Sequence, residues 1–142
     1  MELKLVARNL KPVALSSAYT QRRGSKQRIL TTPARKYKDA LEEEFKKHIY
    51  AHRIIDSRTV GPLLTVKIYF YLPQGDLFTK KMVPKKWDID NRYKLLIDSL
   101  CTSIGTDDKF IFRLHGEKLV NPSNQYMIVV NVRTYKPYEE DE

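Results

Sequence analysis

The clearest strand in this sequence is residues 64–72, Leu64-Thr65-Val66-Lys67-Ile68-Tyr69-Phe70-Tyr71-Leu72. Its apolar residues alternate with more polar ones, and this two-residue period is typical of a strand with one buried face. Pro62 precedes the strand, and Pro73-Gln74-Gly75-Asp76 ends it in a predicted turn. We therefore expect the fold to form around a sheet that is covered on one face and more polar on the other.

Upstream of this strand, residues 3–8 alternate well enough to predict a first strand. Residues 16–27 are rich in small and polar side chains, which predicts a long mobile loop that becomes ordered on binding phosphate. A helix is predicted from Thr32, the expected cap, with Pro33 at its first position, to about Ala51. Its core-facing stripe has helical spacing and consists of Ala34, Tyr37, Leu41, Phe45 and Ile49.

Downstream of the strand, residues 77–86 form a second basic loop, and a helix is expected from Asp90 to about Ser103, stopped by Gly105. Residues 110–119 and 126–135 are predicted strands. The expected order is β-α-β-α-β-β, in the α/β (α+β) class. It forms a small mixed sheet of about four strands with two helices, in a single domain over residues 1–138. The acidic tail, 139–142, is expected to be frayed.

The chain is strongly basic. There are 26 Lys and Arg against 17 Asp and Glu, and four of the acids lie in the tail. Without the tail the net charge rises from +9 to +13, and residues 3–38 contain ten basic residues and no acid. Charge of this sign and density indicates a polyanionic partner, most often nucleic acid. A generally basic protein without such a partner is the alternative.

The number of cysteines and the hydropathy of the chain indicate in which cellular compartment we expect the protein. The only cysteine, Cys101, has no intramolecular partner for a disulfide and is expected to be a buried, inert thiol. No apolar run approaches the roughly 20 residues that a membrane span requires, and the N-terminus does not resemble a signal peptide. We expect no membrane association and a cytoplasmic protein. His48 and His52 are one turn apart, but no carboxylate accompanies them in the spacing of a metalloprotease.

The residues that carry chemistry follow the second basic loop, in Trp87-Asp88-Ile89-Asp90-Asn91-Arg92-Tyr93-Lys94 and Thr106-Asp107-Asp108. At helical spacing Asp90 and Lys94 lie on one face, and Asp88 stands just ahead of the helix. Asp107 or Asp108 can approach Asp88 and Asp90 if the chain reverses direction at Gly105. Crowded carboxylates repel one another and need a cation. Three of them form an oxygen-ligand site for Mg²⁺, with Mn²⁺ as a substitute.

Such a site suits hydrolysis of a phosphodiester, because a divalent metal activates water and stabilises charge on the scissile phosphate. Lys94 would then orient the attacking water or stabilise the transition state. The alternative is structural: an aspartate cap, a surface ion pair between Asp90 and Lys94 worth a few tenths of a kcal/mol, and a turn at 107–108.

The same residues resemble a known signature. Asp88-Ile89-Asp90-Asn91-Arg92-Tyr93-Lys94, a helix containing Asp98, and then Asp107-Asp108 are similar to the motif of the RusA family of Holliday junction resolvases. Residues 28–37 look like the family's segment entering its first helix, and the order of elements agrees to about Thr134. The first loop is longer than expected for the family, and residues 77–86 are unusually rich in lysine.

The resemblance implies a RusA-like nuclease domain in a homodimer that resolves four-way DNA junctions in recombination and repair. Such an enzyme is a Mg²⁺-dependent endodeoxyribonuclease that makes paired nicks, encoded by a bacterium, prophage or phage. It places the catalytic carboxylates and metal ligands on Asp88, Asp90 and Asp108, with Asp107 as the alternative to Asp108, and the catalytic lysine on Lys94. An isologous dimer matches the two-fold symmetry of a junction.

Basic residues near the cluster and in the two loops are predicted to bind DNA phosphates. They are Arg22, Arg23, Lys26, Arg28, Lys80, Lys81, Lys85, Lys86 and Arg92. Two other functions stay open. One is a basic nucleic-acid-binding protein with a structural acidic cluster, and the other is a nuclease acting on forks, flaps or RNA.

Overall fold

The computed structural model describes residues 2–21, 24, 28–52 and 63–138. Its elements are β1 (Glu2–Arg8), η1 (Leu15–Ser17), β2 (Tyr19–Gln21), β3 (Arg28–Leu30), α1 (Thr32–His52), β4 (Leu64–Leu72), α2 (Gln74–Leu77), η3 (Asp90–Arg92), α3 (Tyr93–Ile104), η4 (Asp108–Phe110), β5 (Ile111–Val120) and β6 (Met127–Thr134). The predicted order of the main strands and the two long helices is confirmed. No helix in these described ranges has the length and apolarity that a membrane span needs.

The four-stranded sheet has the order β1-β6-β4-β5 and is mixed. Strand β4 runs parallel to β5 and antiparallel to β6, which in turn pairs antiparallel with β1. The parallel pair is possible because α3 lies between β4 and β5 in the chain and supplies the crossover. The predicted mixed sheet of about four strands is therefore confirmed.

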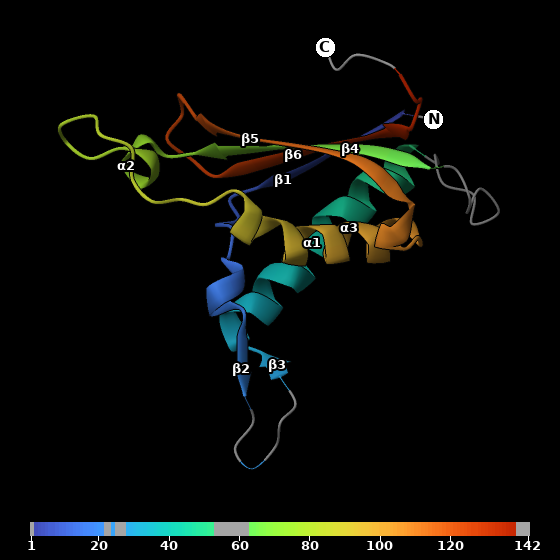
Figure 1. The fold of residues 1–142 in the computed structure, drawn as a ribbon, viewed down its shortest axis with the longest axis horizontal. Helices are drawn as coiled ribbons and strands as arrows, with labels where there is room; N and C mark the ends of the chain where they lie inside the picture. Colours follow the sequence, from blue (N-terminus) through green and yellow to red (C-terminus); the bar gives the residue numbers. More distant parts are fainter. Residues whose placement is uncertain (1, 22–23, 25–27, 53–62, 139–142) are drawn as a thin grey trace.

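Both long helices cover one face of this sheet, as Figure 1 shows. The apolar side chains of β4 at positions 64, 66, 68, 70 and 72 are buried against them, as their alternation predicted. In α1, Ala34, Tyr37, Leu41 and Phe45 are buried, and Ile49 packs at the edge of the core. Helix α1 contacts both α3 and β1. The core therefore lies between the sheet and the two helices.

The predicted cap of α1 was off by one residue. The hydroxyl Oγ1 of Thr31, not of Thr32, accepts a hydrogen bond from the backbone N–H of Ala34 at 3.4 Å. Thr32 already belongs to the helix, so Pro33 takes its second position. Proline remains compatible there because the first helical N–H groups have no partner inside the helix.

The segment 16–27 is not one structureless loop. Strand β2 pairs antiparallel with β3, with Tyr19 opposite Leu30. The hydroxyl of Thr31 donates to the carbonyl of Ser17 at 3.0 Å, which closes the base of this hairpin. Strands of three residues are too short for alternation to reveal them. Arg22, Arg23 and Lys26, three of the predicted DNA-binding residues, lie outside the described residues.

Two smaller differences concern β4 and the chain after it. Thr65 was expected on the more polar face, yet it is fully buried, because its neighbours on the two flanking strands are Arg113 and Arg133. Long arginine stems cover a short side chain between them. Past β4, the expected turn is the short helix α2, and the hydroxyl of Tyr126, the residue before β6, donates to Asp76 in this helix at 2.6 Å.

Gly116 in β5 is required for packing. A Cβ at this position would collide with the ring and hydroxyl of Tyr93, the first residue of α3. Gly116→Ala is expected to lower the free energy of unfolding by about 1–3 kcal/mol, because the overpacked ring must move.

Thermal unfolding followed by circular dichroism measures this loss. Gly75→Ala is the matched control, since a Cβ there meets no atom within 4 Å. Equal melting temperatures for the two variants would show that Tyr93 moves aside without cost.

Candidate active site

Trp87 anchors the chain just before the aspartates. Its side chain is buried, with the ring of Phe70 edge-on at 5.2 Å between centroids. The guanidinium of Arg92 lies 4.3 Å from the centre of its ring. The ammonium of Lys118 donates to the Trp87 backbone carbonyl at 2.9 Å. The entry into the aspartate motif is therefore fixed against β4 and β5.

Asp90 is the first residue of the η3 turn, and Asp88 lies two residues before it. Arg92 donates to the backbone carbonyl of Asp88 at 3.2 Å, and the amide of Asn91 lies 3.5 Å from its Oδ2. Partial burial lowers the pKa of Arg92, while the charges of Asp88, Tyr37 and Asp90 act in the opposite direction. The carboxylate of Asp90 is exposed. Asp88 is therefore oriented by its neighbours, whereas Asp90 faces solvent.

Lys94 forms its ion pair with Asp98, not with Asp90. Its Nζ lies 3.3 Å from Oδ2 of Asp98, one turn further along α3. The charge of Asp98 and its hydrogen bond raise the pKa of Lys94, and Tyr19 and Asp108 add to the effect. The sequence spacing predicts Asp90 and Lys94 on one helical face, but the regular helix begins only at Tyr93. Asp90 belongs to a 3-10 turn, whose three residues per turn give a different rotation.

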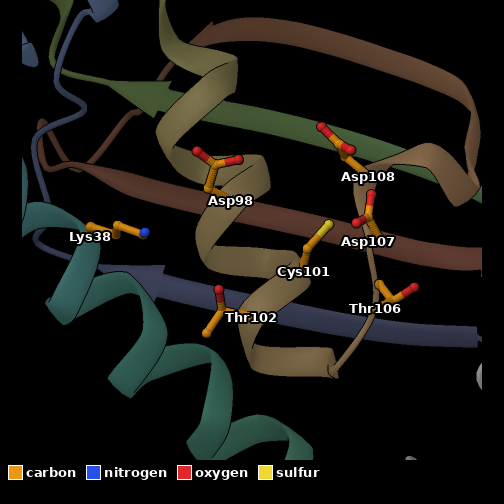
Figure 2. A pocket seen from close by; sticks show the side chains of 7 residues that line it. All are labelled: Lys38, Asp98, Cys101, Thr102, Thr106, Asp107 and Asp108. Carbon is orange, nitrogen blue, oxygen red and sulfur yellow. The ribbon is translucent and has the colours of Figure 1, made fainter. Parts of the chain in front are cut away.

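A pocket of about 280 Å³ lies beside this ion pair. In Figure 2 the side chain of Lys38 reaches towards it from α1, and Asp98 and Cys101 face it from α3. Its lining residues are Lys38, Asp98, Cys101, Thr102, Thr106, Asp107 and Asp108. The chain turns back at Gly105, whose φ of 75° places it in the left-handed region. The predicted reversal after α3 is confirmed, and it brings Asp107 and Asp108 to the side of α3.

Asp107 and Asp108 differ in what they contact. The Asp107 carboxylate caps η4 by accepting from the backbone N–H of Lys109 at 3.0 Å. This hydrogen bond is the main reason that the pKa of Asp107 is lowered, with its interaction with Asp108 second. Asp108 instead contributes to raising the pKa of Lys94. Of the two, Asp107 has a structural task and Asp108 acts on the predicted catalytic lysine.

The expected meeting of three carboxylates is not found. Within the ranges that the structure covers, no three His, Cys, Asp or Glu side chains lie close enough together to hold a metal ion. Asp88 and Asp90 interact with Arg92, whereas Asp98 and Asp108 interact with Lys94. The acidic side chains of the motif thus act on two different cations, Arg92 and Lys94.

Cys101 is buried and has no disulfide, as predicted. Burial raises the pKa of its thiol to about 11, and the charges of Asp108, Asp98 and Asp107 add to this. The thiol is therefore protonated and unreactive at neutral pH.

The predicted DNA-binding residues differ in the contacts that their side chains make within the protein. Lys80, Lys81 and Lys86 are exposed in the loop after α2, while Lys85 donates to the carbonyl of Gly75 at 2.7 Å. Arg28 on β3 is exposed, with its guanidinium 5.4 Å from the ring centre of Tyr19. Arg92 packs on Trp87 and holds Asp88, so the structure gives it an internal role, and its contact with DNA stays a prediction.

Two charged residues of this pocket, Asp98 and Lys38, were not predicted as site residues. Asp98 follows Lys94 by four residues, so helical spacing alone would have indicated the pair. Lys38 carried no such signal, because it lies on what the sequence indicated to be the solvated face of α1.

Comparisons with known proteins support the motif and the fold. The model of the endodeoxyribonuclease RusA family matches residues 9–133, which includes both aspartate pairs and Lys94. A search of curated proteins found no match. Because the family model covers most of the sequence, this chain belongs to the RusA endodeoxyribonuclease family.

Proposed function

We propose that this protein is a Holliday junction resolvase that cuts four-way DNA junctions by paired nicks, using a divalent metal ion and water. The observation that carries the proposal is the family match over residues 9–133. A family of endodeoxyribonucleases implies hydrolysis of phosphodiester bonds in DNA, and RusA nucleases act on branched junctions.

The side chains of the site support this chemistry. We assign Asp88, Asp90 and Asp108 as the catalytic carboxylates and Lys94 as the catalytic cation. The ion pair with Asp98 raises the pKa of Lys94, which favours its charged form beside the pocket. A fixed positive charge near the scissile phosphate stabilises the charge that develops in the transition state.

Magnesium fits the donor chemistry of these residues. The side chains of Asp88, Asp90 and Asp108 offer carboxylate oxygens, the ligands that Mg²⁺ prefers. A Mg²⁺ site often uses one or two carboxylates together with phosphate oxygens of the substrate. Three converged carboxylates are therefore not required before DNA binds. When bound, a divalent cation supplies charge stabilisation and a more acidic water.

We also propose a homodimer as the active form, because paired nicks need two sites related by the two-fold symmetry of the junction. Lys80, Lys81 and Lys86 are exposed and supply charge for phosphate contacts in each protomer. The oligomeric state is measured by light scattering with and without junction DNA.

The test is cleavage of a labelled mobile four-way junction beside a linear duplex built from the same arms. Paired nicks with Mg²⁺, lost in EDTA, are the expected result. Tight junction binding without cleavage in Mg²⁺ or Mn²⁺ would leave the nucleic-acid-binding alternative. Faster cleavage of forks or flaps than of the junction would assign a different nuclease.

Asp98→Asn is expected to lower junction cleavage about tenfold while junction affinity changes little, because the ammonium of Lys94 loses its charged partner. Single-turnover cleavage and a binding titration in Ca²⁺ separate the two effects. Asp98→Glu, which retains the charge, should recover part of the rate. Equal rates for Asp98→Asn and the wild type would remove Asp98 from the positioning of Lys94.

A further inference from the structure

The loop between α2 and Trp87 presents two apolar side chains to solvent at its tip. Met82 is 56% exposed and Val83 is 54% exposed, among the largest exposures of hydrophobic residues in the described chain. In Figure 1 this loop extends beyond the end of the sheet, next to α2 and away from α1 and α3. Neither residue contributes to the core of the protein.

Hydrogen bonds within the loop join the two sides of the tip. Phe78 pairs with Pro84, and Thr79 and Val83 are joined by bonds of 2.9 and 3.1 Å. The backbone N–H of Lys85 donates to Leu77 at 2.7 Å. Because Leu77 and Trp87 are buried, both ends of the loop are anchored. The two apolar side chains are therefore displayed on a fixed support.

The backbone of Met82 has a conformation that methionine rarely adopts. Met82 has a φ of 61°, a region in which asparagine and glycine are favoured and longer side chains are uncommon. The amide of Gln74 lies 3.2 Å from its sulfur atom. An apolar side chain is thus kept at a strained, exposed position where a polar residue would cost less, which suggests a task outside the fold.

The charge around the tip indicates the partner. Lys80, Lys81, Lys85 and Lys86 flank the two apolar residues, and residues 77–87 contain no acid. An apolar pair between basic side chains matches a nucleic acid, in which base faces lie between two phosphate backbones. At the centre of a four-way junction the terminal base pairs of the arms offer such faces without the cost of opening a duplex.

We propose that Met82 and Val83 form an apolar wedge that packs on base pairs at the branch point, while Lys80, Lys81 and Lys86 bind the adjoining phosphates. The wedge selects branched over linear DNA. Its loop leads directly into Trp87 and Asp88, so its contact with the branch point also sets which phosphates reach the carboxylates. This inference rests on the proposed function, since it assumes a branched DNA substrate.

The test uses variants that preserve the loop. Met82→Asn suits the left-handed backbone, and Val83→Thr keeps the branched shape while adding a hydroxyl. The matched control is Phe112→Ser, which removes a side chain 58% exposed on β5 at the opposite end of the sheet. Unfolding curves of all variants confirm that each is folded, and the single variant Val83→Thr is measured should the double one be unstable.

The full-length protein is titrated in Ca²⁺ with a junction that carries 2-aminopurine next to the branch point. We expect the wild type and Phe112→Ser to raise its fluorescence severalfold, and the Met82→Asn/Val83→Thr variant to lose this rise. The same variant should bind the junction about tenfold more weakly and linear duplex equally well. Lys80→Ala/Lys81→Ala should weaken both complexes and reduce the salt slope by about 2.

An unchanged fluorescence rise and junction preference in the wedge variant would overturn the proposal, and would leave the patch as a contact for another protein. If the wild type still cuts junctions while the wedge variant behaves like it, only the wedge proposal fails and the proposed function stands. A wild type with no preference for the junction would overturn both proposals.

Discussion

Asp90→Asn is expected to abolish junction cleavage, with a loss of at least about 100- to 1000-fold in the single-turnover rate. The amide has the shape of the carboxylate but removes one negative charge and one anionic oxygen donor for Mg²⁺. Because Asp90 is exposed at the start of η3, the substitution disturbs no buried contact. Junction affinity should be equal or higher, since one negative charge facing phosphate is removed.

The measurement is a gel assay of cleavage in Mg²⁺, with binding measured in Ca²⁺. Asp39→Asn is the control, because it makes the same change of charge at an exposed position on α1. Cleavage by Asp90→Asn at the wild-type rate would show that the catalytic carboxylates lie elsewhere.

Asp108→Asn should lose cleavage to a similar degree, whereas Asp107→Asn should retain it within a few fold. Asp107 caps η4, and asparagine caps a helical turn about as well as aspartate, so its substitution costs little. Asp108 lines the pocket and acts on the charge of Lys94, so its substitution removes a carboxylate from the site.

Parallel cleavage assays of the two variants decide between the neighbours. The reverse order of activity would assign the third carboxylate to Asp107. Full activity in both would exclude the pair from the reaction and direct attention to Asp98.

The sequence predicted well the elements whose patterns are long. Nine alternating residues defined β4 in full, and the stripe from Ala34 to Ile49 defined the buried face of α1. Gly105 was predicted as the end of α3, and its left-handed conformation confirms the reason. These features depend on residues a few positions apart, so the sequence displays them directly. The hairpin of β2 and β3 was missed because each strand has only three residues.

The aspartate motif, and through it the family, could also be recognised from the sequence alone, because its residues lie within one short segment and a second pair. Only the tertiary structure decided how these side chains are grouped. It paired Lys94 with Asp98 and brought Lys38 from α1 to the pocket, and in the described part of the chain it did not gather three carboxylates into one metal-binding group. The pocket joins segments distant in the sequence, and their meeting depends on how α1 and α3 pack on the sheet. That packing is set by the whole core, and no local spacing contains it.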